Sequence, residues 1–241
     1  MIKLTQRLLG PVTWALLAFT VVMGLWITPP DTLLDGGGNY GRLLYVHPAL
    51  AWVALYVSFG TTTIASGLYL WRRTRSMTMD RIASCAMEVT ALFIALTLIT
   101  GSIWGRPTWG VWWAWDARLT STAILGVLAL GYLALRRAND DPADRARRSA
   151  VYGILIAVNI PIIHFSVVWW KTLHQQATVL TATGQVSVHG SLLLTLLVSF
   201  VAFTLLFAWL LRARYRLEVS RDTARATQQA SALAQRQREG A

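Results

Sequence analysis

The chain has 241 residues, of which 55% are hydrophobic and only 14% charged, and its mean hydropathy is +0.47. Soluble domains carry about a quarter charged residues, so this composition excludes an ordinary soluble domain and indicates a membrane protein. The net charge is +11, but the basic residues cluster between apolar runs, which indicates control of membrane orientation rather than nucleic-acid binding.

Six apolar runs of membrane-spanning length follow one another along the chain. A spanning helix needs about 20 apolar residues, and the runs lie at about 11–28, 46–71, 82–104, 119–136, 149–170 and 190–211. The first run follows Lys3 and Arg7 like the start of a signal peptide, but it is too long for an h-region and no A-x-A site follows it. We therefore predict an all-α polytopic membrane protein with six transmembrane helices, of which the first is retained.

The segments between the runs differ in charge. Of the 22 Lys and Arg residues, 18 lie in four segments on one side of the membrane: before the first run and after the second, fourth and sixth runs. The other 4 lie in the loops on the opposite side. The positive-inside rule therefore places both termini in the cytoplasm. We predict a transmembrane domain over residues 1–211 and a basic cytoplasmic tail over residues 212–241. Three outer loops are expected at about 29–45, 105–118 and 171–189.

Two unusual side chains lie inside the third run. Cys85 is the only cysteine, which excludes an internal disulfide and a C-x-x-C motif, so we interpret it as a small buried hydrophobic residue. An acid inside a span is costly and usually faces the bundle interior or water. Glu88 therefore either forms structural hydrogen bonds or binds a proton.

Every histidine is expected at the outer side of the membrane. The four are His47, His164, His174 and His189. His47 precedes Pro48, which predicts a helix N-cap, and Pro161 predicts a kink close to His164. Imidazoles from two helices at one depth are suited to bind haem iron from opposite sides. The alternative is that each is an interfacial side chain bonded to water and backbone, and that His174 and His189 are simply solvated.

A tryptophan-rich segment occupies residues 104–120 and contains W-G-V-W-W-A-W-D-A-R-L-T at 109–120. Its indole rings would stack on a flat apolar ligand, and Gly110 would let the backbone approach closely. Asp116 and Arg118 would bind polar groups such as propionates. If the segment is helical, three of the rings share one face. The alternative, an aromatic belt at headgroup depth, explains four tryptophans in seven residues poorly: Trp109, Trp112, Trp113 and Trp115.

Several catalytic motifs are absent from the sequence. There is no G-x-x-x-x-G-K-[ST], H-E-x-x-H or G-x-S-x-G motif, which excludes the usual P-loop, zinc-protease and serine-hydrolase chemistry. There is also no C-x-x-C-H, so haem would not be attached covalently in the c-type manner. We expect no enzymatic activity from this chain.

Three stretches together resemble the CcmC family of haem-handling proteins of bacterial cytochrome c maturation, whose tryptophan-rich element is called the WWD segment. They are G-S-I-W-G-R-P-T-W-G, W-G-V-W-W-A-W-D-A-R-L-T and N-I-P-I-I-H-F-S-V-V-W-W-K-T-L-H-Q. The resemblance implies non-covalent haem b at the periplasmic face of the inner membrane. It implies the WWD segment as platform, with His47 and His164 as axial ligands.

The resemblance also implies partners and a function. Haem would be presented to the haem chaperone CcmE. The small membrane protein CcmD and the ABC transporter subunits CcmA and CcmB would complete the complex. One alternative is a b-type electron-transfer cytochrome acting on quinones, but such proteins need histidine pairs deep in the spans, and none lies on the inner side. Another is a haem exporter that moves haem through this chain, for which the spans show little polar lining beyond Glu88.

Overall fold

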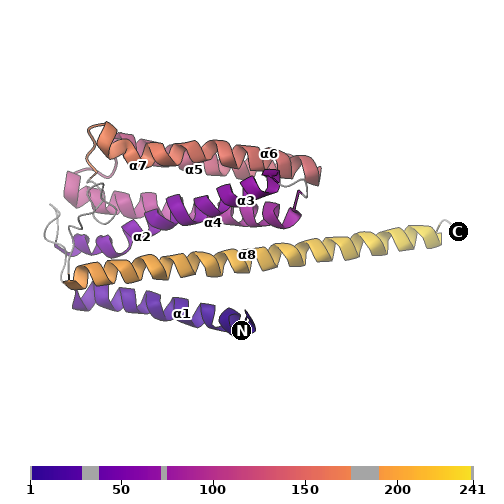
Figure 1. The fold of residues 1–241 in the computed structure, drawn as a ribbon, viewed down its shortest axis with the longest axis horizontal. Coiled ribbons are helices and arrows are strands. Elements are labelled where there is room, and N and C mark those ends of the chain that lie inside the picture. The colour runs from indigo at the N-terminus through magenta and orange to yellow at the C-terminus, as the bar shows by residue number, and fades with distance from the viewer. Residues whose placement is uncertain (1, 29–37, 72–74, 175–189, 240–241) are drawn as a thin grey trace.

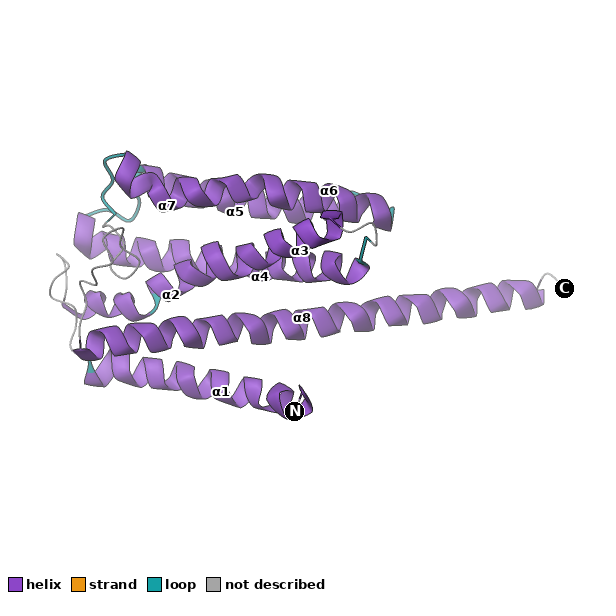
Figure 2. Cartoon of the chain, in the orientation of Figure 1, coloured by secondary structure: helices purple, strands orange, loops and turns teal. Residues whose placement is uncertain are grey.

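The computed structural model describes residues 2–28, 38–71, 75–174 and 190–239. Every regular element in these ranges is a helix (Figure 2). Six helical stretches are long and apolar enough to cross a membrane, which confirms the predicted all-α fold with six spans. His189 lies outside the described residues, as does most of the third outer loop.

The helical elements follow the predicted runs and extend past most of their ends. In chain order they are α1 (Ile2–Val22), η1 (Met23–Ile27), η2 (Gly38–Tyr45), α2 (His47–Trp52), η3 (Val53–Ser58), α3 (Phe59–Trp71), α4 (Met77–Trp109), α5 (Ala117–Arg137), α6 (Pro142–Leu155), η4 (Ile156–Val158), α7 (Asn159–Trp169) and α8 (Gly190–Glu239). The elements η1 and η3 are π-helical turns, and η2 and η4 are 3₁₀ turns.

Two local predictions about prolines can be compared with the structure. The fifth span is irregular just before Pro161, where the 3₁₀ turn η4 separates α6 from α7. Proline has no N–H to bond the carbonyl four residues earlier, so this irregularity has the expected cause. The predicted N-cap at His47 is wrong by one residue. Val46 is the N-cap and His47 begins α2, because Pro48 is also tolerated at the second helical position.

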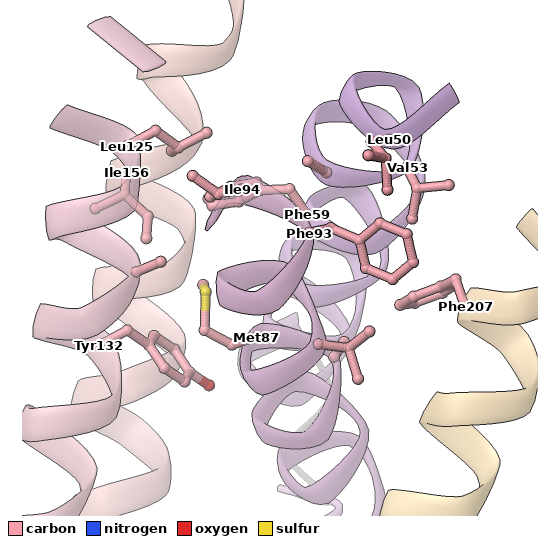
Figure 3. Close-up of a cluster of buried hydrophobic side chains, with 14 of the residues drawn as sticks. Leu50, Val53, Phe59, Met87, Phe93, Ile94, Leu125, Tyr132, Ile156 and Phe207 are labelled. Atoms are coloured by element: carbon pink, nitrogen blue, oxygen red, sulfur yellow. The ribbon is translucent and has the colours of Figure 1, made fainter. Parts of the chain in front are cut away.

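The helix α4 lies in the middle of the bundle. It contacts α3, α5 and α8, while α1 packs on α8 at one side and α7 packs on α5 at the other (Figure 1). A continuous buried cluster joins α4 to the second span, α5, the fifth span and α8, and Figure 3 shows its main side chains. They come from the second span, α4, α5, η4 and α8: Leu50, Val53, Phe59, Met87, Phe93, Ile94, Leu125, Tyr132, Ile156 and Phe207.

The two ends of the chain lie toward the same end of the bundle, and α8 extends well beyond the other helices there (Figure 1). The helix α8 is unbroken from Gly190 to Glu239. The basic tail that begins at residue 212 is therefore a direct continuation of the sixth span. Nearly all side chains of residues 223–239 are exposed.

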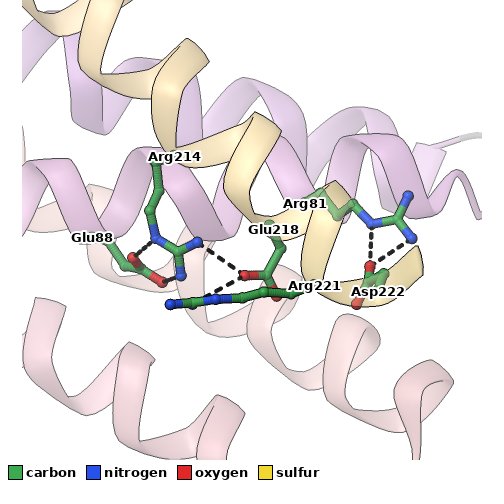
Figure 4. A network of polar contacts seen from close by, with 6 residues as sticks. All are labelled: Arg81, Glu88, Arg214, Glu218, Arg221 and Asp222. Carbon is green, nitrogen blue, oxygen red and sulfur yellow. Dashed lines mark hydrogen bonds and ion pairs between the residues drawn. The ribbon is translucent and has the colours of Figure 1, made fainter. Parts of the chain in front are cut away.

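The helix α4 forms ion pairs with its neighbours at this basic end of the bundle. Arg136 of α5 donates to both oxygens of Asp80, at 2.5 and 2.9 Å, and this pair is almost fully buried. Arg81 bonds Asp222 of α8 at 2.8 Å. Glu88 accepts two bonds from Arg214 of α8, which also reaches Glu218 (Figure 4). Glu88 therefore has a structural partner in α8. The basic tail, which begins at residue 212, thus forms ion pairs with α4 through Arg214 and Asp222.

Candidate functional site

The WWD segment begins in the last turns of α4, at the end of the bundle opposite the basic clusters. Arg106 donates to the carbonyl of Gly110 at 2.5 Å, and Gly110 has a left-handed φ of 79°, which ends the helix. Residues 110–116 form bends and irregular backbone before α5 starts at Ala117. The hypothesis that Trp109, Trp112 and Trp113 share one helical face is therefore wrong, because of these three only Trp109 lies on a helix.

Two glycines open one face of α4 beneath this segment. A Cβ on Gly101 would lie 3.0 Å from Cε1 of His47, and a Cβ on Gly105 would lie 3.0 Å from the ring of Trp109. The two glycines are one helical turn apart and so share a face. The imidazole of His47 and the indole of Trp109 therefore lie close against the α4 backbone.

The position of His47 is fixed by α4. Its Nδ1 lies 3.0 Å from Oγ1 of Thr100, and Trp104 packs edge-on against the ring at a centroid distance of 5.9 Å. The Thr100 hydroxyl donates its proton to the carbonyl of Leu96 at 2.8 Å. Its oxygen therefore accepts from Nδ1–H of His47, and we assign the tautomer in which Nε2 carries the free lone pair.

The ring next to His47 is that of His174, which follows α7. Their centroids are 6.5 Å apart with an interplanar angle of 40°, and Trp109 lies 6.2 Å from His174. The segment 171–174 is irregular, but it folds back over the end of α5. Two histidines that are 127 positions apart in the sequence are therefore neighbours.

His164, the second ligand expected from the resemblance, has different neighbours. Its Nδ1 lies 2.5 Å from the hydroxyl of Tyr56, which the π turn η3 presents. Its ring packs edge-on against Phe165 at a centroid distance of 4.8 Å. The structure thus brings His174, rather than His164, beside His47.

Asp116 and Arg118 hold the His174 segment. Asp116 caps α5 by accepting from the backbone N–H of Leu119 at 2.8 Å, and its other oxygen accepts from the N–H of Leu173 at 3.2 Å. Arg118 donates to the carbonyl of His164 at 2.9 Å and contacts Ser166 Oγ and His174 Nδ1, each at 3.4 Å. Both side chains, expected to bind propionates, therefore have protein partners.

The remaining tryptophans of the WWD segment are more open. Trp112 and Trp115 expose 60% and 84% of their surface, and Trp115 packs edge-on against Trp113 at 5.6 Å. The indole N–H of Trp113 is buried and has no hydrogen-bond partner within the described residues. The segment therefore offers exposed indole rings and one unsatisfied donor, and it touches the histidine pair through Trp109.

The described residues contain no group of three or more His, Cys, Asp or Glu side chains able to hold a metal ion. A site built only from such side chains is therefore not indicated in this part of the chain. Two facing imidazoles suit a metal whose other ligands come from a macrocycle.

Several residues that contact the site residues were not singled out from the sequence. Thr100 and Ser166 are ordinary polar residues in apolar runs, and Tyr56 is reoriented by a π turn that has no clear sequence signal. Gly101 and Gly105 did carry a signal, because G-x-x-x-G spacing lets another group approach a helix closely.

Comparison with known proteins agrees with this architecture. The family model described as CcmC, Heme exporter protein C, matches residues 1–230. A protein named heme exporter protein C from Bradyrhizobium diazoefficiens is 42% identical over 238 residues, which cover 97% of this chain and 88% of the relative. Its namesake from Haemophilus influenzae is 39% identical over 213 residues, covering 88% and 84%.

A more distant similarity extends to mitochondria. A ccmC-like mitochondrial protein of Marchantia polymorpha, named for cytochrome c biosynthesis, is 36% identical over 201 residues, covering 83% of this chain and 82% of the relative. The family match spans all six helical stretches and the WWD segment. The chain therefore belongs to the heme exporter protein C (CcmC) family, whose members are membrane transport proteins rather than enzymes.

Proposed function

We propose that this protein binds haem b non-covalently at its outer face and passes it on for cytochrome c maturation. The observation that carries the proposal is the pair of imidazoles, His47 and His174, beside the WWD segment. The relatives named heme exporter protein C support haem as the cargo and cytochrome c maturation as its destination.

The separation of the two rings fits a shared metal. A metal–imidazole bond is about 2 Å long, and ring centroids 6.5 Å apart leave room for one metal between the two rings. The assigned tautomer of His47 presents Nε2 as a lone-pair donor. We therefore revise the axial pair to His47 and His174, with His164 in a supporting position bonded to Tyr56.

The WWD segment supplies a platform at the edge of the bundle. Trp109 contacts His174, and the exposed rings of Trp112 and Trp115 are suited to stack on a porphyrin. Trp113 has an unsatisfied N–H that suits a haem propionate. A site built partly from an irregular loop with Gly110 holds its cargo while leaving it accessible for transfer.

The charge distribution supports an orientation with the site in the periplasm. The basic clusters lie at the end of the bundle opposite His47, His174 and the WWD segment, and the positive-inside rule assigns a basic end to the cytoplasm. In a bacterium the corresponding membrane is the inner membrane. The haem site then faces the compartment in which cytochromes c are assembled.

The partners follow from the same proposal. Haem is presented to the chaperone CcmE, and CcmD and the ABC subunits CcmA and CcmB complete the assembly. The absence of a P-loop motif from the sequence supports this division, because the nucleotide chemistry then belongs to another chain. A quinone-linked b-type cytochrome is disfavoured, because none of the three histidines in the described residues lies at the end that holds the basic clusters.

The test is the visible spectrum of haem in detergent-purified protein. We expect a bis-histidine signal in the wild type that is lost or shifted in both His47→Ala and His174→Ala. His164→Ala is the matched control, because it changes an outer histidine that we place outside the ligand pair, and it should keep the signal. A spectrum that changes in His164→Ala but not in His174→Ala would restore the original ligand assignment. Haem-free wild type after haem-replete expression would contradict the proposal.

A further inference from the structure

The two proposed ligands have opposite hydrogen-bonding surroundings. Nδ1 of His47 faces the hydroxyl oxygen of Thr100, whose own proton is donated to Leu96. Nδ1 of His174 faces Nη1 of Arg118 at 3.4 Å, and a guanidinium only donates. One ring is therefore held by an acceptor and the other by a cationic donor.

This difference affects how each ring binds iron. A neutral imidazole that ligates through Nε2 carries its proton on Nδ1 and is strengthened by an acceptor there. Thr100 supplies that acceptor to His47 before any haem arrives. At His174 the same arrangement would point Nδ1–H at an N–H of Arg118, and ligation through Nδ1 would displace the guanidinium. Either way, the Arg118 contact is lost when His174 binds iron.

The backbone supports the same asymmetry. His47 begins α2, and its ring lies against Gly101 and Trp104 of α4. His174 lies in the irregular segment 171–174, where the N–H of Leu173 donates to Asp116 and Arg118 contacts the His174 ring. His47 is thus part of a helix packed on α4, whereas His174 belongs to no helix.

We propose that His47 is the anchoring ligand and His174 the releasable ligand, and that Arg118 is the positioning residue that favours release by competing with iron for His174. The inference rests on the proposed haem site. It assigns an order to transfer: the iron–His174 bond breaks first, the Arg118 contact re-forms, and haem remains on His47 with one face open to an incoming ligand from the acceptor protein.

The test is the rate at which haem passes from the full-length protein to an excess of a haem-scavenging apoglobin. Thr100→Val removes the acceptor at His47 and should speed haem loss by roughly tenfold, since losing one partner of such a bond costs on the order of 1 kcal/mol or more. Arg118→Gln offers His174 an oxygen acceptor and should slow loss by roughly three- to tenfold. Arg118→Lys keeps the cation and should stay close to the wild type.

Two controls separate this effect from local damage. Ser166→Ala removes one Arg118 contact but not the one with His174, and it should leave the rate unchanged. Independently of Arg118, His47→Ala should lose haem faster than His174→Ala, and free imidazole should restore the bis-imidazole spectrum in His174→Ala more readily than in His47→Ala.

The possible failures are distinguishable. If neither histidine variant changes the haem spectrum, the proposed site itself is wrong. If both change it but lose haem at equal rates, or His174→Ala loses it faster, the ligand pair stands and the order of release is overturned. Faster loss in Arg118→Gln with a normal rate in Arg118→Lys and Ser166→Ala would likewise overturn the role of Arg118.

Discussion

The two ends of the bundle use polar side chains in opposite ways. At the basic end, which we propose to face the cytoplasm and call the inner end, acids and arginines pair with one another across helices, as in Asp80–Arg136 and Glu88–Arg214. At the opposite end, called the outer end, imidazole and indole groups gather, and Trp112 and Trp115 stay largely exposed. Groups that satisfy each other fix how helices pack, whereas groups with open positions are prepared for a ligand. The comparison predicts that inner substitutions change stability and outer ones change haem binding.

The largest expected effect is at the inner end. Asp80→Ala should lower the free energy of unfolding by about 3–5 kcal/mol, because it leaves the Arg136 guanidinium buried without its carboxylate. Thermal unfolding in detergent measures this loss. Asp144→Ala, which breaks the exposed pair with Arg148, is the control and should cost about 0.5 kcal/mol or less. A changed haem spectrum in the folded Asp80→Ala protein would break the separation of the two ends.

A methyl group added at the outer end should change haem binding rather than stability. Gly101→Ala places a Cβ 3.0 Å from Cε1 of His47 and should weaken haem binding by roughly tenfold, since overpacking costs about 1–3 kcal/mol. Haem titration followed by absorbance measures the affinity. Gly60→Ala, where nothing lies within 4 Å of the added methyl, is the control. Equal affinities in both variants would show that His47 does not depend on the α4 surface.

Two helix caps provide a matched pair across the membrane. Asp116→Ala and Asp141→Ala each remove an N-cap and should cost about 1 kcal/mol of stability. Only Asp116→Ala also releases the N–H of Leu173, so only this variant should shift the haem spectrum through His174. If Asp141→Ala shifts the spectrum equally, the cap acts through global stability rather than through the site.

The smallest effect is expected from the end of α8. Deleting residues 223–239 removes exposed side chains and keeps the Arg81–Asp222 pair, so stability should change by about 0.5 kcal/mol or less. The haem spectrum should be unchanged. Loss of haem from the truncated protein would show that the inner extension communicates with the outer site.

The spans and their order could be predicted from the sequence because a bilayer demands long apolar runs. Charge asymmetry gave an orientation because membranes sort basic residues. Local features such as the irregular turn before Pro161 follow from the chemistry of one residue. These predictions need no knowledge of which helices touch.

Contacts between distant residues were beyond such reasoning. The Glu88–Arg214 pair joins residues 126 positions apart, and its partner choice depends on the packing of α8 against α4. The expected pairing of His47 with His164 assumed equal depth along two spans. The chain instead turns after α7 and returns over α5, so a loop histidine reaches the site. The WWD segment likewise has helical spacing, but Gly110 ends the helix first.

The length of α4 between its inner ion pair and its outer histidine contact has a consequence for the lipid. Glu88 and Thr100 are separated by about 18 Å along a helix axis, whereas the hydrocarbon core of a bilayer is about 30 Å thick. The Arg214 pair and His47 therefore cannot both lie beyond hydrocarbon of ordinary thickness. Either the bilayer thins around α4 or one of these polar groups resides below the headgroups. If the bilayer thins, hydrophobic mismatch acts on the end of α4 that contacts His47, and acyl-chain length then becomes a variable for how tightly the proposed site holds haem.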